Sequence, residues 1–191
     1  MGMKRETYER KFRELFDYIV KLVDNEVDKW RACKIEVRKN EVSPTKFVYF
    51  VEWQGRPLNA FTLEFQKDSS GYLHILLYYD RQKEEIYRLH RKIDERVSPL
   101  LSLLSYFIEE TITAEAKRIA LQHGLFAGIK GSKLVVHIGD YEFCLLYWQG
   151  SNSWEVECYD LHLWEKYECG DSHPLEYLYE LLRALVLRLL L

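Results

Sequence analysis

Hydrophobic residues recur at three- and four-residue steps along residues 4–31, with charged residues between them. This spacing places the apolar side chains on one face of an amphipathic helix. The segments that follow are short, rich in apolar residues and separated by turn-forming residues, over 34–39, 46–53, 59–67 and 72–79. The pattern predicts one long helix followed by an antiparallel meander of four strands.

The same order of elements recurs further along the chain. A helix is predicted over 82–97, and Ser98-Pro99 is typical of the cap and first position of another helix, which ends at Gly124. A loop with Gly128 and Gly131 comes next. Four strands and a last helix are then expected, over 133–138, 141–148, 153–160, 162–167 and 174–190.

Short sequence matches between the two halves favour an internal duplication. The tripeptide Trp-Gln-Gly occurs at 53–55 and again at 148–150, KIEV matches KLVV, and EEIYRLHRKI matches EYLYELLRAL, all in the same order. We therefore predict an α+β fold of two α-β-β-β-β-α units, residues 1–98 and 99–191, packed as one body about an approximate two-fold axis. Each unit combines a meander sheet with amphipathic helices.

Alternation along the strands predicts which side chains share a face of each sheet. In the second sheet the outer face is expected to carry Glu142, Cys144, Leu146, Trp148, Glu155, Glu157 and Tyr159. In the first sheet the core face is expected to carry Val48, Phe50, Phe61, Leu63 and Phe65, which leaves on the opposite face Phe47, Tyr49, Val51 and Trp53. That opposite face and the leucine-rich last helix are too apolar for water, which favours burial between the units or in a homodimer.

Charge and composition narrow the class of protein. Residues 1–98 hold 20 Lys and Arg against 17 Asp and Glu, a net +3, whereas residues 99–191 hold 7 against 13, a net −6. No secretory signal or membrane-spanning run is apparent, so a cytoplasmic protein with reduced cysteines and no membrane partner is expected. Asn and Gln total only nine, which is typical of a thermophilic source.

Two Cys-x₃-His pairs are candidate zinc ligands. They are Cys158 with His162 and Cys169 with His173, and sulfur and imidazole ligands in a set of four suit tetrahedral zinc. If residues 158–162 form a strand, however, the first pair is separated by about 13 Å, at roughly 3.3 Å per residue. A shared ion then requires a bend at Tyr159-Asp160, and the alternative is a set of structural residues without a cofactor.

Candidate contacts to nucleic acid or to a partner lie on the segment YRLHRKIDER and at the two Trp-Gln-Gly tripeptides. The residues are Arg88, Arg91, Lys92, Arg96, Trp53 and Trp148. Several cations on one surface favour phosphate, and aromatic rings stack on bases. Acidic neighbours in the same segment equally allow ordinary ion pairs along a helix.

No phosphate-binding loop, nucleophile elbow or zinc-protease motif is present, so the sequence favours binding over catalysis. We expect a non-catalytic macromolecule-binding or assembly protein of pseudo-two-fold architecture, which binds a protein partner or itself as a homodimer. The alternative is a nucleic-acid-binding or nucleic-acid-processing factor that uses the basic first half. A zinc-stabilised module is the third hypothesis.

Overall fold

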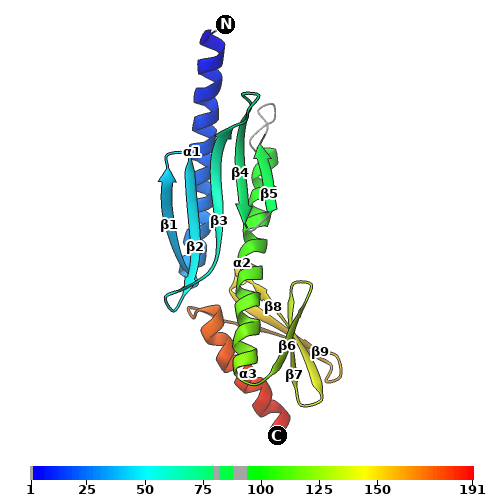
Figure 1. Cartoon of the computed structure of the whole chain (residues 1–191). Coiled ribbons are helices and arrows are strands. Elements are labelled where there is room, and N and C mark those ends of the chain that lie inside the picture. The colour runs from blue at the N-terminus through cyan, green and yellow to red at the C-terminus, as the bar shows by residue number, and fades with distance from the viewer. Residues whose placement is uncertain (1, 80–81, 88–93) are drawn as a thin grey trace. The chain divides into compact units, whose positions relative to one another are not determined.

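The computed structural model describes residues 2–79, 82–87 and 94–191, with side chains described for residues 5–79 and 99–191. It consists of helices and antiparallel sheets, which confirms the α+β class (Figure 1). In chain order the elements are α1 (Gly2–Ala32), β1 (Glu36–Ser43), β2 (Lys46–Trp53), β3 (Arg56–Lys67), β4 (Leu73–Tyr79), β5 (Gln82–Tyr87), α2 (Asp94–Gln122), β6 (Phe126–Lys130), β7 (Lys133–Ile138), β8 (Tyr141–Trp148), the 3₁₀ turn η1 (Gln149–Ser151), β9 (Ser153–Cys158), β10 (Leu163–Glu168) and α3 (Pro174–Leu190).

The chain divides into two compact units. The first contains the chain up to Arg31 together with Glu36–Leu104, and the second contains Ala32–Ile35 and Ser105–Leu191. Each unit contains one five-stranded antiparallel meander, in the order β1-β2-β3-β4-β5 in the first and β10-β9-β8-β7-β6 in the second. Neighbouring strands are thus also neighbours in sequence, as the alternating pattern predicts.

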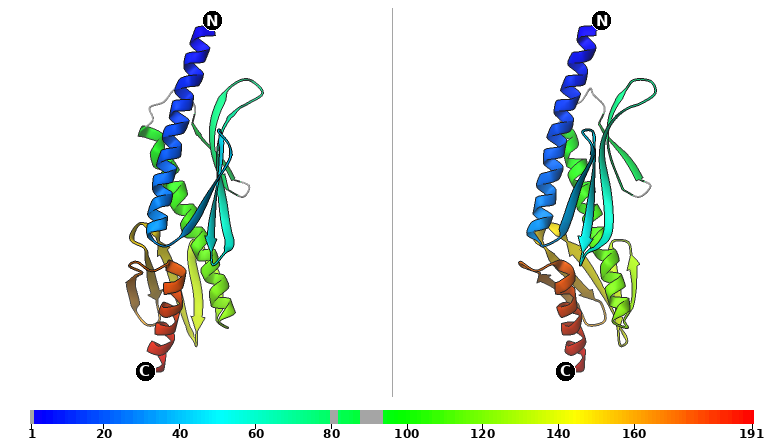
Figure 2. Two further views of the ribbon diagram at one scale, coloured as in Figure 1. Left: turned by 90° about the vertical axis from the view of Figure 1, so that its left-hand side faces the viewer. Right: turned by 60° about the vertical axis from the view of Figure 1, so that its left-hand side comes forward.

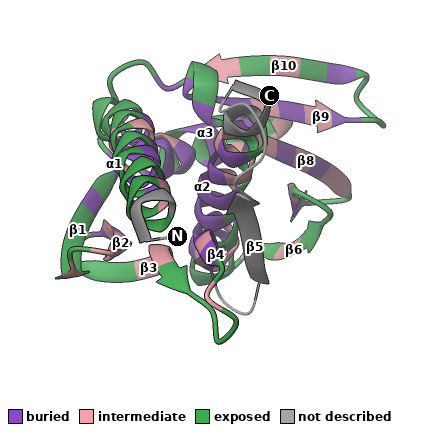
Figure 3. Cartoon of the chain, turned by 90° about the horizontal axis from the view of Figure 1, so that it is seen from above, coloured by how far each residue is buried: buried purple, intermediate pink, exposed green. Residues whose placement is uncertain are grey.

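In the first unit, α1 runs along one face of the sheet (Figure 2). Its apolar positions are buried on one side of the helix, as Figure 3 shows, and they include Phe12, Phe16, Ile19, Val23, Val27 and Trp30. The ring of Phe16 stacks on Phe47 at 6.1 Å between centroids, and Trp30 meets Phe61 edge-on at 6.1 Å. The amphipathic helix predicted over 4–31 is confirmed.

The predicted face assignment of the first sheet is correct for Phe61 and Leu63 of β3, which are buried, but wrong for β2. Tyr49 pairs with Phe61 in the register of β2 and β3, so these two rings share a face, where they stack at 4.7 Å. Tyr49, Val51 and Trp53 are fully or almost fully buried, whereas Val48 and Phe50 are half-buried on the other face. The apolar face that was expected to be buried between the units or in a homodimer is therefore covered by α1 of its own unit.

Two predicted segments have a different structure. Residues 82–87, expected to open a helix, form strand β5, because they pair with the apolar strand β4 from Tyr79 to Ile75. Cross-strand pairing here overrides the helical preference of the Glu-rich sequence. Residues 88–93 lie outside the described part of the chain, and α2 begins at Asp94, so Pro99 lies inside the helix rather than at its first position.

Segment 126–130, expected to be a loop because of its glycine, forms β6. Ala127 pairs with Val136 and Gly128 with Val135. Pairing with the apolar strand β7 therefore places this segment in the sheet. Each sheet consequently has five strands instead of the four predicted. The end of α2 agrees with the prediction, since Gly124 has φ +77° and the amide of Leu125 donates to the carbonyl of Ala120.

The two Trp-Gln-Gly tripeptides form different turns. Gln54 and Gly55 both have positive φ, +52° and +72°, and form a two-residue hairpin turn between Trp53 and Arg56. Gln149 and Gly150 instead belong to η1, and the left-handed residue there is Asn152, with φ +43°. Trp53 is buried whereas Trp148 is exposed, so the matched tryptophans lie on opposite kinds of sheet face.

In the second unit, α3 packs an apolar face into the core. His173 caps the helix and Pro174 occupies its first turn, and the buried residues that follow are Leu175, Leu178, Leu181, Leu182 and Leu185. Leu187 and Leu190, near the end of the helix, are exposed. Among the described residues, no helix combines the length and hydrophobicity that a membrane crossing requires.

Candidate functional site

The outer face of the second sheet carries exposed aromatic residues. Strand alternation places Phe143, Leu145 and Tyr147 of β8 in the core and turns Cys144, Leu146 and Trp148 outward, as predicted. The register pairs Glu155 with Leu146 and with Lys166, so this carboxylate lies in the middle of the same outer face. Trp148 is 44% exposed and Trp164, on β10, is 72% exposed.

Glu155 links the two exposed tryptophans. The indole N–H of Trp148 donates to Oε2 of Glu155 at 3.2 Å, and the indole N–H of Trp164 donates to Oε1 at 2.9 Å. Each indole is thus oriented by one oxygen of a single carboxylate. We call these three residues, Trp148, Glu155 and Trp164, the indole–carboxylate cluster.

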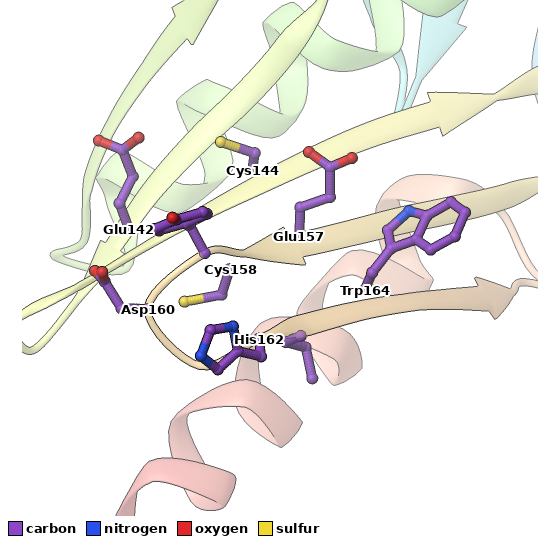
Figure 4. A pocket seen from close by; sticks show the side chains of 9 residues that line it. Glu142, Cys144, Glu157, Cys158, Asp160, His162 and Trp164 are labelled. Atoms are coloured by element: carbon purple, nitrogen blue, oxygen red, sulfur yellow. The ribbon is translucent and has the colours of Figure 1, made fainter.

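A pocket of about 580 Å³ lies beside this cluster, at the hairpin that joins β9 to β10 (Figure 4). Trp164 belongs to both the cluster and the pocket lining. The lining also contains carboxylates, two thiols and one imidazole, namely Glu142, Glu157, Asp160, Cys144, Cys158 and His162. Acidic groups therefore outnumber basic ones around the pocket.

The other acidic side chains of this face are neutralised locally. Lys130 lies 3.2 Å from Glu142, and Lys133 lies 2.9 Å from Glu157. The hydrogen bond to Glu157 raises the pKa of the Lys133 ammonium, which keeps this pair charged. Among the described residues no cation lies within 4.0 Å of Glu155, whose carboxylate accepts from the two indole N–H groups while the charge of Lys133 acts on it only from a greater distance.

The thiol of Cys144 does not have the environment of a nucleophile. Burial raises its pKa, and the nearby carboxylate of Glu142 raises it further. An activated cysteine requires the opposite shift, because the thiolate is the reactive form. The pocket contains sulfur, imidazole and carboxylate groups, but the charge distribution around Cys144 favours the neutral thiol.

The four candidate zinc ligands occupy two places. The chain turns at 159–162, where the amide of His162 donates to the carbonyl of Tyr159, so β9 ends earlier than predicted and Cys158 and His162 line the same pocket. Cys169 is buried, and His173 is the cap of α3, where Nδ1 accepts from the amide of Leu175 at 3.0 Å.

Burial, followed by the nearby Cys33, raises the pKa of Cys169 to about 12, and burial lowers that of His173 to about 4. Burial thus favours the neutral thiol and the neutral imidazole. In the described part of the chain, no group of three or more His, Cys, Asp or Glu side chains is arranged to hold a metal ion.

The candidate nucleic-acid contacts fall mostly outside the described residues. Arg88, Arg91 and Lys92 lie there, and the side chain of Arg96, at the start of α2, is also not described. Trp53 is 4% exposed and packs in the core of the first unit, which leaves little of its ring for a partner. Of the predicted contact residues with described side chains, Trp148 is the exposed one.

Seven described cations of the first unit form ion pairs with carboxylates. Arg38 lies 3.1 Å from Glu52, Lys39 lies 2.9 Å from Asp24, and comparable pairs join Arg10 to Glu14, Lys29 to Glu26, Arg31 to Asp28, Lys46 to Glu64 and Lys67 to Glu9. Phosphate binding needs cations that are free to replace counterions. These seven cations are therefore less available to a phosphate than the net positive charge of this half suggests.

Sequence reasoning placed Trp148 and Glu155 on the outer face but missed Trp164. Its signal was present in the segment LWEKYE, where Trp164 occupies the same alternate positions as the charged residues Lys166 and Glu168. A tryptophan on the same face of a strand as Lys166 and Glu168 is expected to be exposed.

No family model, curated protein or solved structure matches this chain.

Proposed function

We propose that this protein is a non-catalytic binding protein that contacts another macromolecule through the outer face of its second sheet. The observation that carries this proposal is the exposure of Trp148 and Trp164 on one sheet face. Large aromatic side chains are usually removed from water, and contiguous exposed ones mark interaction sites. Tryptophan is also among the residues that contribute most to binding energy when a partner covers it.

The geometry of the cluster supports a binding role further. Both indoles are fixed by hydrogen bonds to Glu155, so little side-chain freedom is lost when a partner packs against them. The neighbouring pocket has a volume of about 580 Å³, within the usual range for sites that accept a side chain or a small ligand. A prearranged aromatic surface beside a pocket is an arrangement typical of recognition.

Self-association is part of the same proposal, but its surface differs from the one expected. The face of Phe47 and Trp53 is covered within its own unit, whereas Leu187 and Leu190 of α3 remain exposed. A homodimer would therefore use this end of α3. The internal duplication, likewise proposed, rests on the shared order of a five-stranded meander between two helices and not on the Trp-Gln-Gly match.

Affinity capture with quantitative mass spectrometry tests the proposal. The wild-type chain is compared with the double variant Trp148→Ala/Trp164→Ala and with the control Tyr18→Ala, which removes a 43% exposed aromatic ring from α1. We expect one partner to be retained by the wild type and by the control and lost by the double variant. Retention of the same partners by all three proteins would contradict a binding role for this face.

A further inference from the structure

The indole–carboxylate cluster has the chemical features of a site for an organic cation. Both indole N–H groups are engaged by Glu155, so the groups left for a partner are the ring faces and the remaining lone pairs of the carboxylate. The face of an indole ring attracts a guanidinium or ammonium group, and a carboxylate pairs with the same groups. Both parts of the cluster therefore favour a cation.

We propose that the outer face of the second sheet binds a basic protein segment, and that an Arg or Lys side chain of this segment lies against Trp148 and Trp164 and pairs with Glu155. This inference rests on the proposed binding function and specifies the partner. We propose a peptide segment because the cluster and the adjoining pocket lie one after the other on β8, β9 and β10. Successive side chains of an extended segment could occupy both.

Charge complementarity supports this choice of partner. Glu142 and Glu157 already have lysine partners, whereas Glu155 has no cation within 4.0 Å among the described residues. An apolar partner would bury Glu155 without a directly paired cation, leaving two indole N–H groups and the more distant Lys133 to stabilise its charge, which is costly. A guanidinium supplies the missing positive charge and pairs with a carboxylate through two parallel hydrogen bonds.

The pocket extends the same preference beyond the cluster. Glu157 is paired with Lys133, but Asp160 also lines the pocket and residues 99–191 have a net charge of −6, so a second basic side chain is favoured beside Asp160. Glu155 and Asp160 repel the phosphates of a nucleic acid and the side chains of an acidic segment. The surface therefore discriminates by sign of charge as well as by aromatic contact.

Fluorescence anisotropy of a labelled peptide tests the proposal on the full chain. The probe is a short Gly/Ser peptide with spaced arginines, and the comparison probes are the same peptide with glutamates in their place and a single-stranded DNA. We expect the arginine peptide to bind and the two anionic probes not to bind. Trp164→Ala and Glu155→Gln should each weaken its binding about tenfold, which corresponds to about 1.4 kcal/mol.

The matched control is Glu110→Gln, which removes the same charge from an exposed position on α2 of the same unit. Equal weakening by Glu110→Gln and Glu155→Gln would show that only net charge matters and would overturn the proposal. Absence of binding by the arginine peptide would also overturn it, as would binding of an anionic probe that depends on Trp164. A dimer that is seen by light scattering and is lost in Trp148→Ala/Trp164→Ala would show that this face binds a second copy of the chain and not a basic segment.

The two proposals fail in distinguishable ways. If the arginine peptide does not bind but the double variant still loses a captured partner, the face binds a macromolecule of other chemistry and only the present inference is wrong. If the capture experiment shows no dependence on Trp148 and Trp164, the binding role of this face is wrong as well.

Discussion

The hydroxyl of Tyr147 donates a hydrogen bond of 3.0 Å to Oδ1 of Asn152, and both side chains are buried. The side-chain amide nitrogen, Nδ2, of Asn152 donates in turn to the main-chain carbonyls of Gly170 and Ser172, at 3.0 and 3.1 Å. The main-chain carbonyl of Asn152 accepts from the main-chain amide of Cys169 at 2.9 Å. A single asparagine thus connects the turn after β8 to the segment that leads into α3.

Replacing Asn152 should lower stability by two separable effects. Asn152→Ala removes three side-chain hydrogen bonds and leaves a β-carbon at φ +43°, so we expect a loss of about 3 kcal/mol in the free energy of unfolding. Asn152→Gly removes the same bonds but relieves the backbone strain, and should cost about 1 kcal/mol less. Urea denaturation measures both, and equal losses would refute the assigned contribution of the backbone.

The two Trp-Gln-Gly turns should respond differently to alanine. Gly55 has φ +72°, which alanine adopts only with strain, whereas Gly150 has no positive φ. A β-carbon meets no atom within 4 Å at either position, so packing does not distinguish them. We expect Gly55→Ala to cost about 1 kcal/mol and Gly150→Ala to stay within about 0.5 kcal/mol of wild type. Equal thermal shifts in the two variants would contradict the difference between the turns.

Burial of His173 should make stability depend on pH. Its pKa falls from the ordinary value of 6.5 to about 4 because burial disfavours the imidazolium. Below pH 6.5 the unfolded chain binds a proton at this position and the folded chain does not. The stability that the neutral His173 allows is therefore fully present above pH 6.5. As the pH falls below this value, the free energy of unfolding decreases, by about 3 kcal/mol at pH 4.

The variant His173→Asn isolates this effect from the titration of carboxylates. Asparagine retains a side-chain acceptor for the amide of Leu175 at the start of α3 but does not titrate. Its free energy of unfolding should be lower than that of wild type at pH 7 and should fall less between pH 7 and pH 4. Parallel pH profiles for the two proteins would exclude His173 as a source of acid sensitivity.

Buried and exposed tryptophans of the second unit should differ in their effect on stability. Trp154 is fully buried and donates to the carbonyl of Pro174 at 3.0 Å, so Trp154→Phe should cost about 2 kcal/mol because it removes this hydrogen bond and leaves a small cavity. Trp164→Ala removes a side chain that is 72% exposed and should change stability by no more than about 0.5 kcal/mol. A large loss in Trp164→Ala would assign this residue to folding instead of binding.

Much of the fold was predictable because its signals are local. The three- and four-residue spacing along 4–31 and the strict alternation of 141–148 depend only on which side chains face a core. β5 and β6 were missed because neither the Glu-rich sequence of 82–87 nor the glycine of 126–130 carries a strand signal of its own. Their structure is determined by apolar partner strands, which are not visible in a local window.

The candidate site was predicted only in part. Trp148 was assigned to the outer face from alternation, but its link to Trp164 through Glu155 depends on the pairing of three strands. The matched Trp-Gln-Gly tripeptides wrongly suggested equivalent tryptophans. Trp53 lies on a buried sheet face and Trp148 on an exposed one, because a shift of one residue places a strand side chain on the other face. The proposed thermophilic source, the homodimer and the contacts at Arg88, Arg91, Lys92 and Arg96 remain predictions.

The central claim, that Trp148 and Trp164 form a binding face for a basic segment, is tested most directly by the indole N–H signals of the five tryptophans in a ¹⁵N correlation spectrum. Trp→Phe variants assign the signals, and the arginine peptide is then titrated into the full chain. The account predicts that the signals of Trp148 and Trp164 shift together with increasing peptide while those of the buried Trp30, Trp53 and Trp154 stay in place. Shifts confined to the buried tryptophans, or no shift at saturating peptide, would contradict it.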